Sequence, residues 1–239
     1  MTAPALELAG VSRSYGGLRP LRIQELTVAA GEHVALMGLD QPMAEVFMNL
    51  VTGAWLPEHG DVKVFGQPTA AIADSAEWLT VVDRFGIVTE RAVLLDALTL
   101  LQNLAVPFTL DIEPMPDDVA RRAAELAREL DIPSSQWEQP VGALDAAGRA
   151  RVRIARALAL DPPVILLYHP TATLDRDEVV PIGEHLRAVA TRRGAAIVAV
   201  TADQTFAAAV AGRLLTLDAS TGRLTESRRS RWFGRLIGW

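Results

Sequence analysis

The 239-residue sequence has no cysteine, so it can form neither disulfide bonds nor thiolate metal sites. No stretch reaches the roughly 18 consecutive apolar residues that a membrane-spanning helix requires. The N-terminal residues also lack the basic region followed by an apolar run that is typical of a secretory signal. These absences predict a cytoplasmic protein that reaches a membrane only through a partner or an interfacial segment.

Positive charge is scarce, and lysine is nearly missing. The formal net charge of −6 argues against a nucleic-acid-binding surface, so we expect no nucleic-acid partner. Lys63 is the only lysine among the 23 basic residues, and all the others are arginine. A phosphate-binding site anywhere else in the chain would therefore have no lysine.

Strand and helix patterns alternate along most of the chain. The first third reads as short strands, including a half-exposed hairpin and a buried strand that ends at Gly38. Residues 96–108 and 117–132 have helical spacing, and a later helix is closed by Gly194 as its C-cap. Alternation of this kind predicts an α/β fold with a mainly parallel core sheet that is covered on both faces.

Three segments carry a family resemblance through their order and spacing. They are residues 37–66 (MG, seven residues, then VFMNLVTGAWLPEHGDVKVFG), residues 94–108 (LLDALTLLQNLAVPF) and residues 149–175 (RARVRIARALALDPPVILLYHPTATLD). Together they resemble the nucleotide-binding domain of the ATP-binding cassette (ABC) family, most of all the small lipid, lipoprotein and MacB-like cassettes.

The resemblance implies a P-loop NTPase-like fold with an N-terminal antiparallel β subdomain and a small helical subdomain. We expect the cassette over residues 1–226, its helical subdomain at about 96–160, and a separate C-terminal tail over 227–239.

The phosphate loop departs from the pattern of the family. A working loop uses glycines to expose N–H groups, a lysine for the phosphates and a hydroxyl for Mg²⁺. Here Ala44 stands at the lysine position, Glu45 replaces the hydroxyl, and only the glycine at Gly38 remains. Asp40 and Glu45 place carboxylates at a helix N-terminus that normally attracts an anion. Either one of these acids satisfies the helix end internally, or both substitutions are neutral drift.

The other positions that carry the chemistry of the family are substituted as well. Glu90 stands for the Q-loop glutamine and Ala202 for the switch histidine. Tyr168 and His169 stand where the family has a Mg²⁺-binding aspartate and a glutamate that orients water. A histidine can act as a base in principle, but a packed or partner-facing role for His169 is the favoured interpretation.

The signature loop of the family has also changed. Its five positions hold Leu144, Asp145, Ala146, Ala147 and Gly148. In the family this loop donates to the γ-phosphate across a dimer, and Asp145 would repel that phosphate. Since the substituted groups act as a unit, we expect no catalytic residue, no cofactor, no metal site and no ATP hydrolysis.

Contact positions of the family persist. Tyr15 stands where an aromatic residue stacks on adenine, although a structural role in a hairpin is the more common one. The D-loop residues Thr173, Leu174 and Asp175 are retained and imply contact with a second cassette. The surface expected to grip the cytoplasmic helices of a permease comprises Glu90, Arg91, Leu94, Leu95 and Asp96.

The C-terminal tail has a different character from the rest of the chain. It interleaves basic and aromatic residues, among them Arg231, Trp232, Phe233, Arg235 and Trp239. This pattern suits either the headgroup region of an anionic membrane or docking onto protein.

The sequence therefore predicts a catalytically inactive ABC cassette, a structural or regulatory subunit of a membrane transport complex for lipid or lipoprotein. It would lie on the inner face of the membrane and bind permease subunits and a second cassette, either another protein or a copy of itself. Two alternatives stay open: a scaffold outside transport, as in cell-division cassettes, and a weak ATP-binding subunit with residual ATPase activity.

Overall fold

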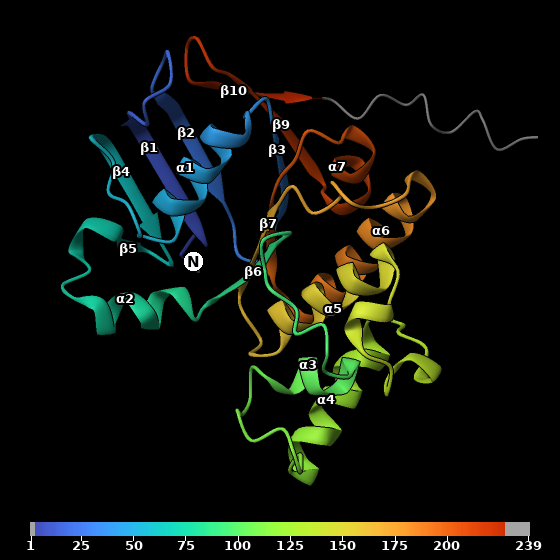
Figure 1. Cartoon of the computed structure of the whole chain (residues 1–239). Helices are drawn as coiled ribbons and strands as arrows, with labels where there is room; N and C mark the ends of the chain where they lie inside the picture. Colours follow the sequence, from blue (N-terminus) through green and yellow to red (C-terminus); the bar gives the residue numbers. More distant parts are fainter. Residues whose placement is uncertain (1–2, 228–239) are drawn as a thin grey trace, which may run out of the picture.

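The computed structural model describes residues 3–227 and contains two sheets. The smaller sheet is antiparallel, with strand order β2-β1-β4-β5. Its strands are β1 (Leu6–Arg13), β2 (Leu21–Val28), β4 (His59–Val64) and β5 (Gln67–Pro68). The expected antiparallel N-terminal region is thus present (Figure 1). The C-terminal tail, with Arg231, Trp232, Phe233, Arg235 and Trp239, lies outside the described residues.

The main sheet has the order β10-β9-β3-β8-β7-β6, in which only the edge strand β10 runs antiparallel to its neighbour. Its strands are β3 (His33–Met37), β6 (Phe85–Thr89), β7 (Val164–Tyr168), β8 (Ala196–Val200), β9 (Arg213–Asp218) and β10 (Arg223–Ser227). The predicted fold class, with a mainly parallel core sheet, is confirmed.

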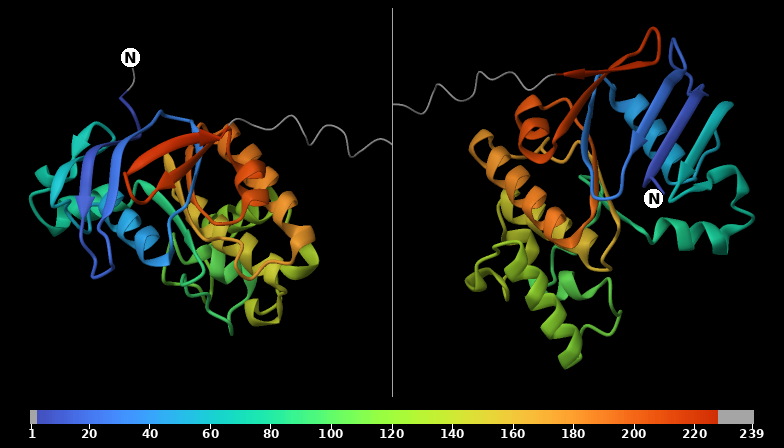
Figure 2. Two further views of the ribbon diagram at one scale, coloured as in Figure 1. Left: turned by 90° about the horizontal axis from the view of Figure 1, so that it is seen from above. Right: turned by 180° about the vertical axis from the view of Figure 1, so that it is seen from behind.

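Helices cover both faces of the main sheet (Figures 1 and 2). They are α1 (Gln41–Val51), α2 (Ser75–Val82), α3 (Leu100–Ala105), α4 (Asp117–Glu129), α5 (Ala146–Leu158), α6 (Arg176–Arg193) and α7 (Gln204–Val210), with 3-10 turns at Thr69–Ala71, Ser134–Gln136 and Val141–Ala143. None of the helices in the described part of the chain is both long and apolar enough to cross a bilayer.

Strand β7 shows how the two cores arise. Successive side chains of a strand point to opposite faces. Val164 and Leu166 belong to the core around α1 and the smaller sheet, whereas Ile165 and Leu167 belong to the core under α3 to α7. All five residues of β7 are buried. A strand covered on both faces must be apolar throughout, which is why VILLY has no polar alternation.

Sequence reasoning placed most elements but not all of their limits. Gly194 closes α6 in the left-handed conformation with φ 67°, as predicted. The helix expected from residue 96 begins only at Leu100, because Thr99 and Gln102 form a capping box there. Helix α2 and strands β6 and β10 were not predicted.

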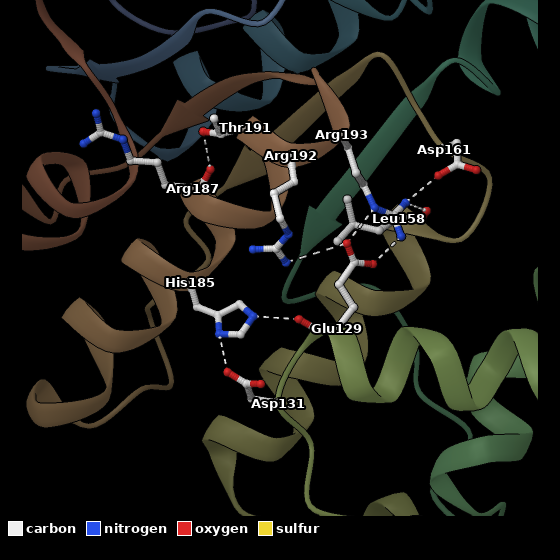
Figure 3. Close-up of polar contacts among 9 residues, drawn as sticks. All are labelled: Glu129, Asp131, Leu158, Asp161, His185, Arg187, Thr191, Arg192 and Arg193. Carbon is white, nitrogen blue, oxygen red and sulfur yellow. Dashed lines mark hydrogen bonds and ion pairs between the residues drawn. The ribbon is translucent and has the colours of Figure 1, made fainter.

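An ionic clamp joins the end of α4 to α6 (Figure 3). Arg193 donates to both carboxylate oxygens of Glu129, with distances of 3.1 Å from Nε and 2.5 Å from Nη2. Its Nη1 donates to the Leu158 carbonyl at 2.6 Å and to the Asp161 carboxylate at 2.7 Å. The hydrogen bond with Glu129 raises the pKa of Arg193 above the ordinary arginine value. The Arg193 guanidinium therefore links α6 to the ends of α4 and α5.

His185 adds a second link between the same helices. One ring nitrogen lies 2.7 Å from the Glu129 carbonyl oxygen, and the other lies 2.9 Å from a carboxylate oxygen of Asp131. The segment that turns out of α4 is thus held against α6 by both a cation and an imidazole.

We expect Arg193→Ala to lower the free energy of unfolding by about 2–3 kcal/mol, because it leaves the largely buried Glu129 carboxylate without its main partner. The matched control is Arg192→Ala, since Arg192 reaches Glu129 only at 3.9 Å and its side chain is 58% exposed. That change should cost less than about 0.5 kcal/mol. Urea unfolding measures both, and equal losses would show that the clamp does not stabilise the fold.

Candidate nucleotide site

Four of the predicted site positions lie at one edge of the main sheet. Gly38, Glu90, His169 and Ala202 all follow parallel strands, namely β3, β6, β7 and β8. Ligands of open α/β sheets bind at this carboxyl edge. The fold therefore gathers residues that are up to 164 positions apart in the sequence.

The N-terminus of α1 is closed by a side chain of the protein itself. Asp40 is the N-cap residue, and its carboxylate accepts a hydrogen bond from the Met43 amide at 2.8 Å. The Asp40 carbonyl accepts from the Ala44 amide at 2.9 Å. A carboxylate at this position also interacts favourably with the helix dipole. This geometry agrees with the first of the two alternatives for Asp40 and Glu45, in which one of these acids satisfies the helix end internally.

The one retained glycine of the loop has a packing role. Gly38 has φ +83°, which favours glycine, and a Cβ there would lie 2.6 Å from the Leu217 carbonyl oxygen in β9. Gly38 is thus required by the close approach of two strands. Its retention says nothing about phosphate binding.

Two further contacts occupy the start of α1. Ala44, at the lysine position, is fully buried in the core between the sheets. The Tyr168 hydroxyl donates to the Gln41 carbonyl at 3.3 Å. Glu45 pairs with Arg91 at 3.4 Å, but both side chains are at least half exposed, so this pair contributes little to stability.

His169 and Glu90 present polar atoms that have no partner among the described residues. His169 Nε2 and Glu90 Oε1 are both buried and without a hydrogen bond. Burial lowers the pKa of His169, and the negative charge of Glu90 partly opposes this. His169 also has φ 44°, an uncommon value for a residue with a side chain. The described residues contain no group of three or more His, Cys, Asp and Glu side chains that could hold a metal.

The signature segment, like the phosphate loop, is followed by a helix that begins at an aspartate N-cap. Asp145 is the N-cap of α5, and its carboxylate accepts from the Gly148 amide at 2.7 Å. Leu144, Ala146 and Ala147 flank this cap. In the part of the chain that the structure covers, no hydrogen bond or ion pair joins residues 144–148 to the strand ends.

Tyr15 is partly buried and packs against the core between the two sheets, whereas the D-loop is mostly exposed. Burial, and to a lesser degree the charge of Asp40, raise the pKa of Tyr15. Asp175 is the N-cap residue of α6, yet its side chain makes no cap hydrogen bond. Thr173 and Asp175 are exposed and Leu174 is partly buried.

A groove of about 350 Å³ lies beside the expected permease-contact residues. Leu94 is the only one of the five predicted contact residues that lines it. Two residues that sequence reasoning missed are Arg153 and Arg156 of α5, which also line this groove. They donate to the Ala92 carbonyl at 3.3 Å and the Val93 carbonyl at 2.8 Å. Their spacing of three along a helix was the available signal, since it places both on one face.

Comparisons with known proteins agree with this architecture. The family model for the ABC transporter matches residues 21–172. The chain belongs to the ABC transporter family. It is 32% identical to the lipoprotein-releasing system ATP-binding protein LolD of Anaeromyxobacter dehalogenans, over 87% of this chain and 88% of that protein.

Other relatives are longer than this chain. It is 34% identical to the macrolide export ATP-binding/permease protein MacB 1/2 of Paracoccus denitrificans, over 95% of this chain but only 34% of that protein. It is 28% identical to the methionine import ATP-binding protein MetN of Brucella abortus and covers 58% of it. The chain thus spans about a third to just over half of these relatives.

Solved structures share the fold. A dimeric bacterial ABC transporter cassette superposes with a TM-score of 0.74 at 24% identity, over 93% of this chain and 98% of that one. CbiO1 of Clostridium perfringens superposes with a TM-score of 0.78 at 20% identity, over 93% of this chain and 87% of that one.

The prediction that this chain is not an enzyme is wrong by these comparisons. Relatives that match over 87–95% of the chain are named ATP-binding proteins, and the family match spans residues 21–172, a range that includes the phosphate loop and β7. The error was to conclude from several substituted positions of one chain, taken together, that the activity is lost. In the family each nucleotide lies between two cassettes, so the contacts of one chain do not decide turnover.

We expect Asp40→Ala to lower the free energy of unfolding by about 1 kcal/mol, because the Met43 amide loses its acceptor. Asp175→Ala is the matched control, since Asp175 is also an N-cap aspartate but makes no cap hydrogen bond. It should change stability by a few tenths of a kcal/mol at most. Thermal and urea unfolding of both variants measure this, and equal effects would count against the internal anion.

Proposed function

We propose that this chain is the cassette subunit of a membrane transport complex for lipid or lipoprotein, and that it binds ATP weakly on its own. It would lie on the inner face of the membrane and grip a permease through the groove beside Leu94 and its neighbours Glu90, Arg91, Leu95 and Asp96. The observation that supports this most strongly is the match to LolD over most of both chains.

The geometry of α1 supports weak binding of nucleotide. The Asp40 carboxylate accepts the hydrogen bond of the Met43 amide, and a bound phosphate would need that same donor. Glu45 adds a second carboxylate one turn later, and Ala44 supplies no positive charge. Each close pair of carboxylate and phosphate opposes binding by roughly 1 kcal/mol in a water-like dielectric. We place the vestigial contacts of the site at Tyr15, Gly38, Tyr168, His169 and Ala202.

A second cassette completes this proposal. The solved relative with a TM-score of 0.74 is a dimer. We assign the corresponding contact in this chain to the exposed D-loop residues Thr173 and Asp175 with Leu174 between them. The signature residues 144–148 would face the nucleotide of that second cassette, and residues 96–160 would form the helical subdomain that carries them.

Removal of the two acids tests the nucleotide part of the proposal. We expect Asp40→Gly with Glu45→Ser to bind MgATP at least tenfold more tightly than wild type by calorimetry, because two repulsive charges are gone. Glycine is tolerated at an N-cap at a cost of a few tenths of a kcal/mol, so the variant should fold.

The control is Asp74→Gly with Glu77→Ser, which makes the same change at α2, where Asp74 caps through the amides of Ala76 and Glu77. ATP turnover is measured in the same samples. Unchanged affinity of the first variant, or an equal gain in the control, would contradict the proposal.

Co-purification tests the transport part. The tagged chain, isolated from detergent-solubilised membranes of its source organism, should carry a polytopic membrane protein in a fixed ratio. Loss of that protein with Leu95→Asp would locate the contact, and this variant should keep the wild-type melting temperature because Leu95 is 41% exposed. Recovery of only soluble proteins would overturn the transport role.

A further inference from the structure

The loop that joins β1 to β2 is mostly exposed, and Tyr15 is its exception. Ser14 and residues 16–19 are all exposed, with Leu18 fully so. Tyr15 packs instead against the core between the two sheets. Gly16 has φ 83°, a left-handed conformation that favours glycine and lets the chain turn directly after Tyr15. Because ordering such a loop costs conformational entropy, the contacts at its ends decide how firmly the Tyr15 side chain is held.

Glu58 holds the residue directly before Tyr15. Its Oε2 atom accepts hydrogen bonds from the Ser14 amide at 3.1 Å and from the Ser14 hydroxyl at 2.9 Å. The hydrogen bonds from the Ser14 hydroxyl and amide lower the pKa of the Glu58 carboxyl. The last residue of β1 that pairs with β4 is Ser12, opposite His59. The Glu58 carboxylate therefore continues the link between these two segments beyond the end of the strand pairing.

The residue on the other side of Ser14 is held by the same segment of the chain. Arg13 donates from Nη1 to the Leu56 carbonyl at 3.2 Å, and its guanidinium lies 5.3 Å from the centroid of the Trp55 ring. The Trp55 amide in turn donates to the Asn49 carbonyl of α1 at 3.0 Å. Residues 55–58 thus connect the start of the Tyr15 loop to the helix whose N-terminus carries the phosphate position.

The Tyr15 ring lies against Gly17 on the other side of the turn. A Cβ atom at Gly17 would lie 2.6 Å from Tyr15 Cε2 and 2.8 Å from Cζ, which is closer than Cβ atoms approach other heavy atoms. Gly17, unlike Gly16, does not have a positive φ. The contact with the ring, and not the backbone conformation, is therefore what favours glycine at this position.

We infer that Glu58 is a positioning residue for Tyr15, and that it acts on the contact between the Tyr15 ring and the base of a bound nucleotide. The inference rests on the proposed function and adds a residue outside the motif positions. Without the Glu58 carboxylate, Ser14 would lose both of its acceptors and the loop would need to be ordered when the nucleotide binds. That cost weakens the contact with the base. The phosphates, which lie at α1, would be unaffected.

Tyrosine NMR and calorimetry on the full-length chain test this inference, because Tyr15 and Tyr168 are the only two tyrosines. Tyr168→Phe assigns the two ring signals. We expect MgATP to shift the Tyr15 signal more than magnesium tripolyphosphate, which has no base. Glu58→Ala should move the Tyr15 signal without any ligand, since Ser14 is released. It should weaken MgATP binding about threefold and leave the affinity for tripolyphosphate unchanged.

Two further variants separate positioning from a general loss of structure. Glu58→Gln should keep the wild-type affinity for MgATP, because both hydrogen bonds use one oxygen and the glutamine amide also has an oxygen that accepts. Gly17→Ala should weaken MgATP binding as Glu58→Ala does, because its methyl group displaces the Tyr15 ring.

The matched control is Glu77→Ala. Glu77 is also an exposed glutamate whose Oε2 accepts from a loop amide, that of Ala73 at 2.8 Å. This control should change neither affinity nor the Tyr15 signal. Equal weakening of MgATP and tripolyphosphate binding by Glu58→Ala, or unchanged affinity for both, would overturn the inference and leave the proposed function standing. A wild-type chain that binds neither ligand would contradict the proposed nucleotide binding itself, and the contact with the base would fall with it.

Discussion

The hydrogen bond between the Asp40 carboxylate and the Met43 amide closes the N-terminus of α1, the position to which we assign the phosphate contacts of the family. The first amides of a helix have no partner within the helix and need an acceptor from elsewhere. In a phosphate-binding loop the ligand supplies that acceptor. Here the Asp40 side chain supplies an acceptor for the Met43 amide, and the buried face of α1 packs in the core between the two sheets.

The same solution appears at α5, where Asp145 accepts from the Gly148 amide. In a head-to-tail dimer of cassettes, the N-termini of α1 and α5 would approach one nucleotide from two chains. Both ends then carry a carboxylate where the family offers donors to a phosphate. A nucleotide held between two copies of this chain would meet negative charge from both sides, whereas an unlike partner would supply its own loops.

The sequence predicted the fold well because local signals agreed with it. Apolar strands and the glycine at Gly194 each act over a few residues, whereas the capping box at Thr99, an equally local signal, was missed and the start of α3 was predicted too early. The Asp40 cap was likewise predictable, since an aspartate directly before a helix is a short-range signal. The pairing of Glu45 with Arg91 and the groove lined by Arg153 and Arg156 join residues far apart in the chain. Helical spacing places the two arginines on one face, but no local pattern specifies which distant residues lie opposite them.

The error about enzymatic activity has a related cause. The motif positions of one sequence show only which groups a single chain contributes to a nucleotide site. Nucleotide turnover in this family depends on residues from two chains. Missing contacts in a single sequence are therefore evidence about affinity and not about the activity of the assembly.

The proposed weak binding of nucleotide depends most on the competition between the Asp40 carboxylate and a phosphate for the Met43 amide. The direct measurement is the NMR chemical shift of that amide during titration with MgATP, in wild type and in Asp40→Ala. We expect the Met43 signal of the variant to reach half of its full shift at an ATP concentration about fivefold lower than in wild type. Equal shifts in the two proteins would show that Asp40 does not hold the phosphate position, and would contradict the account.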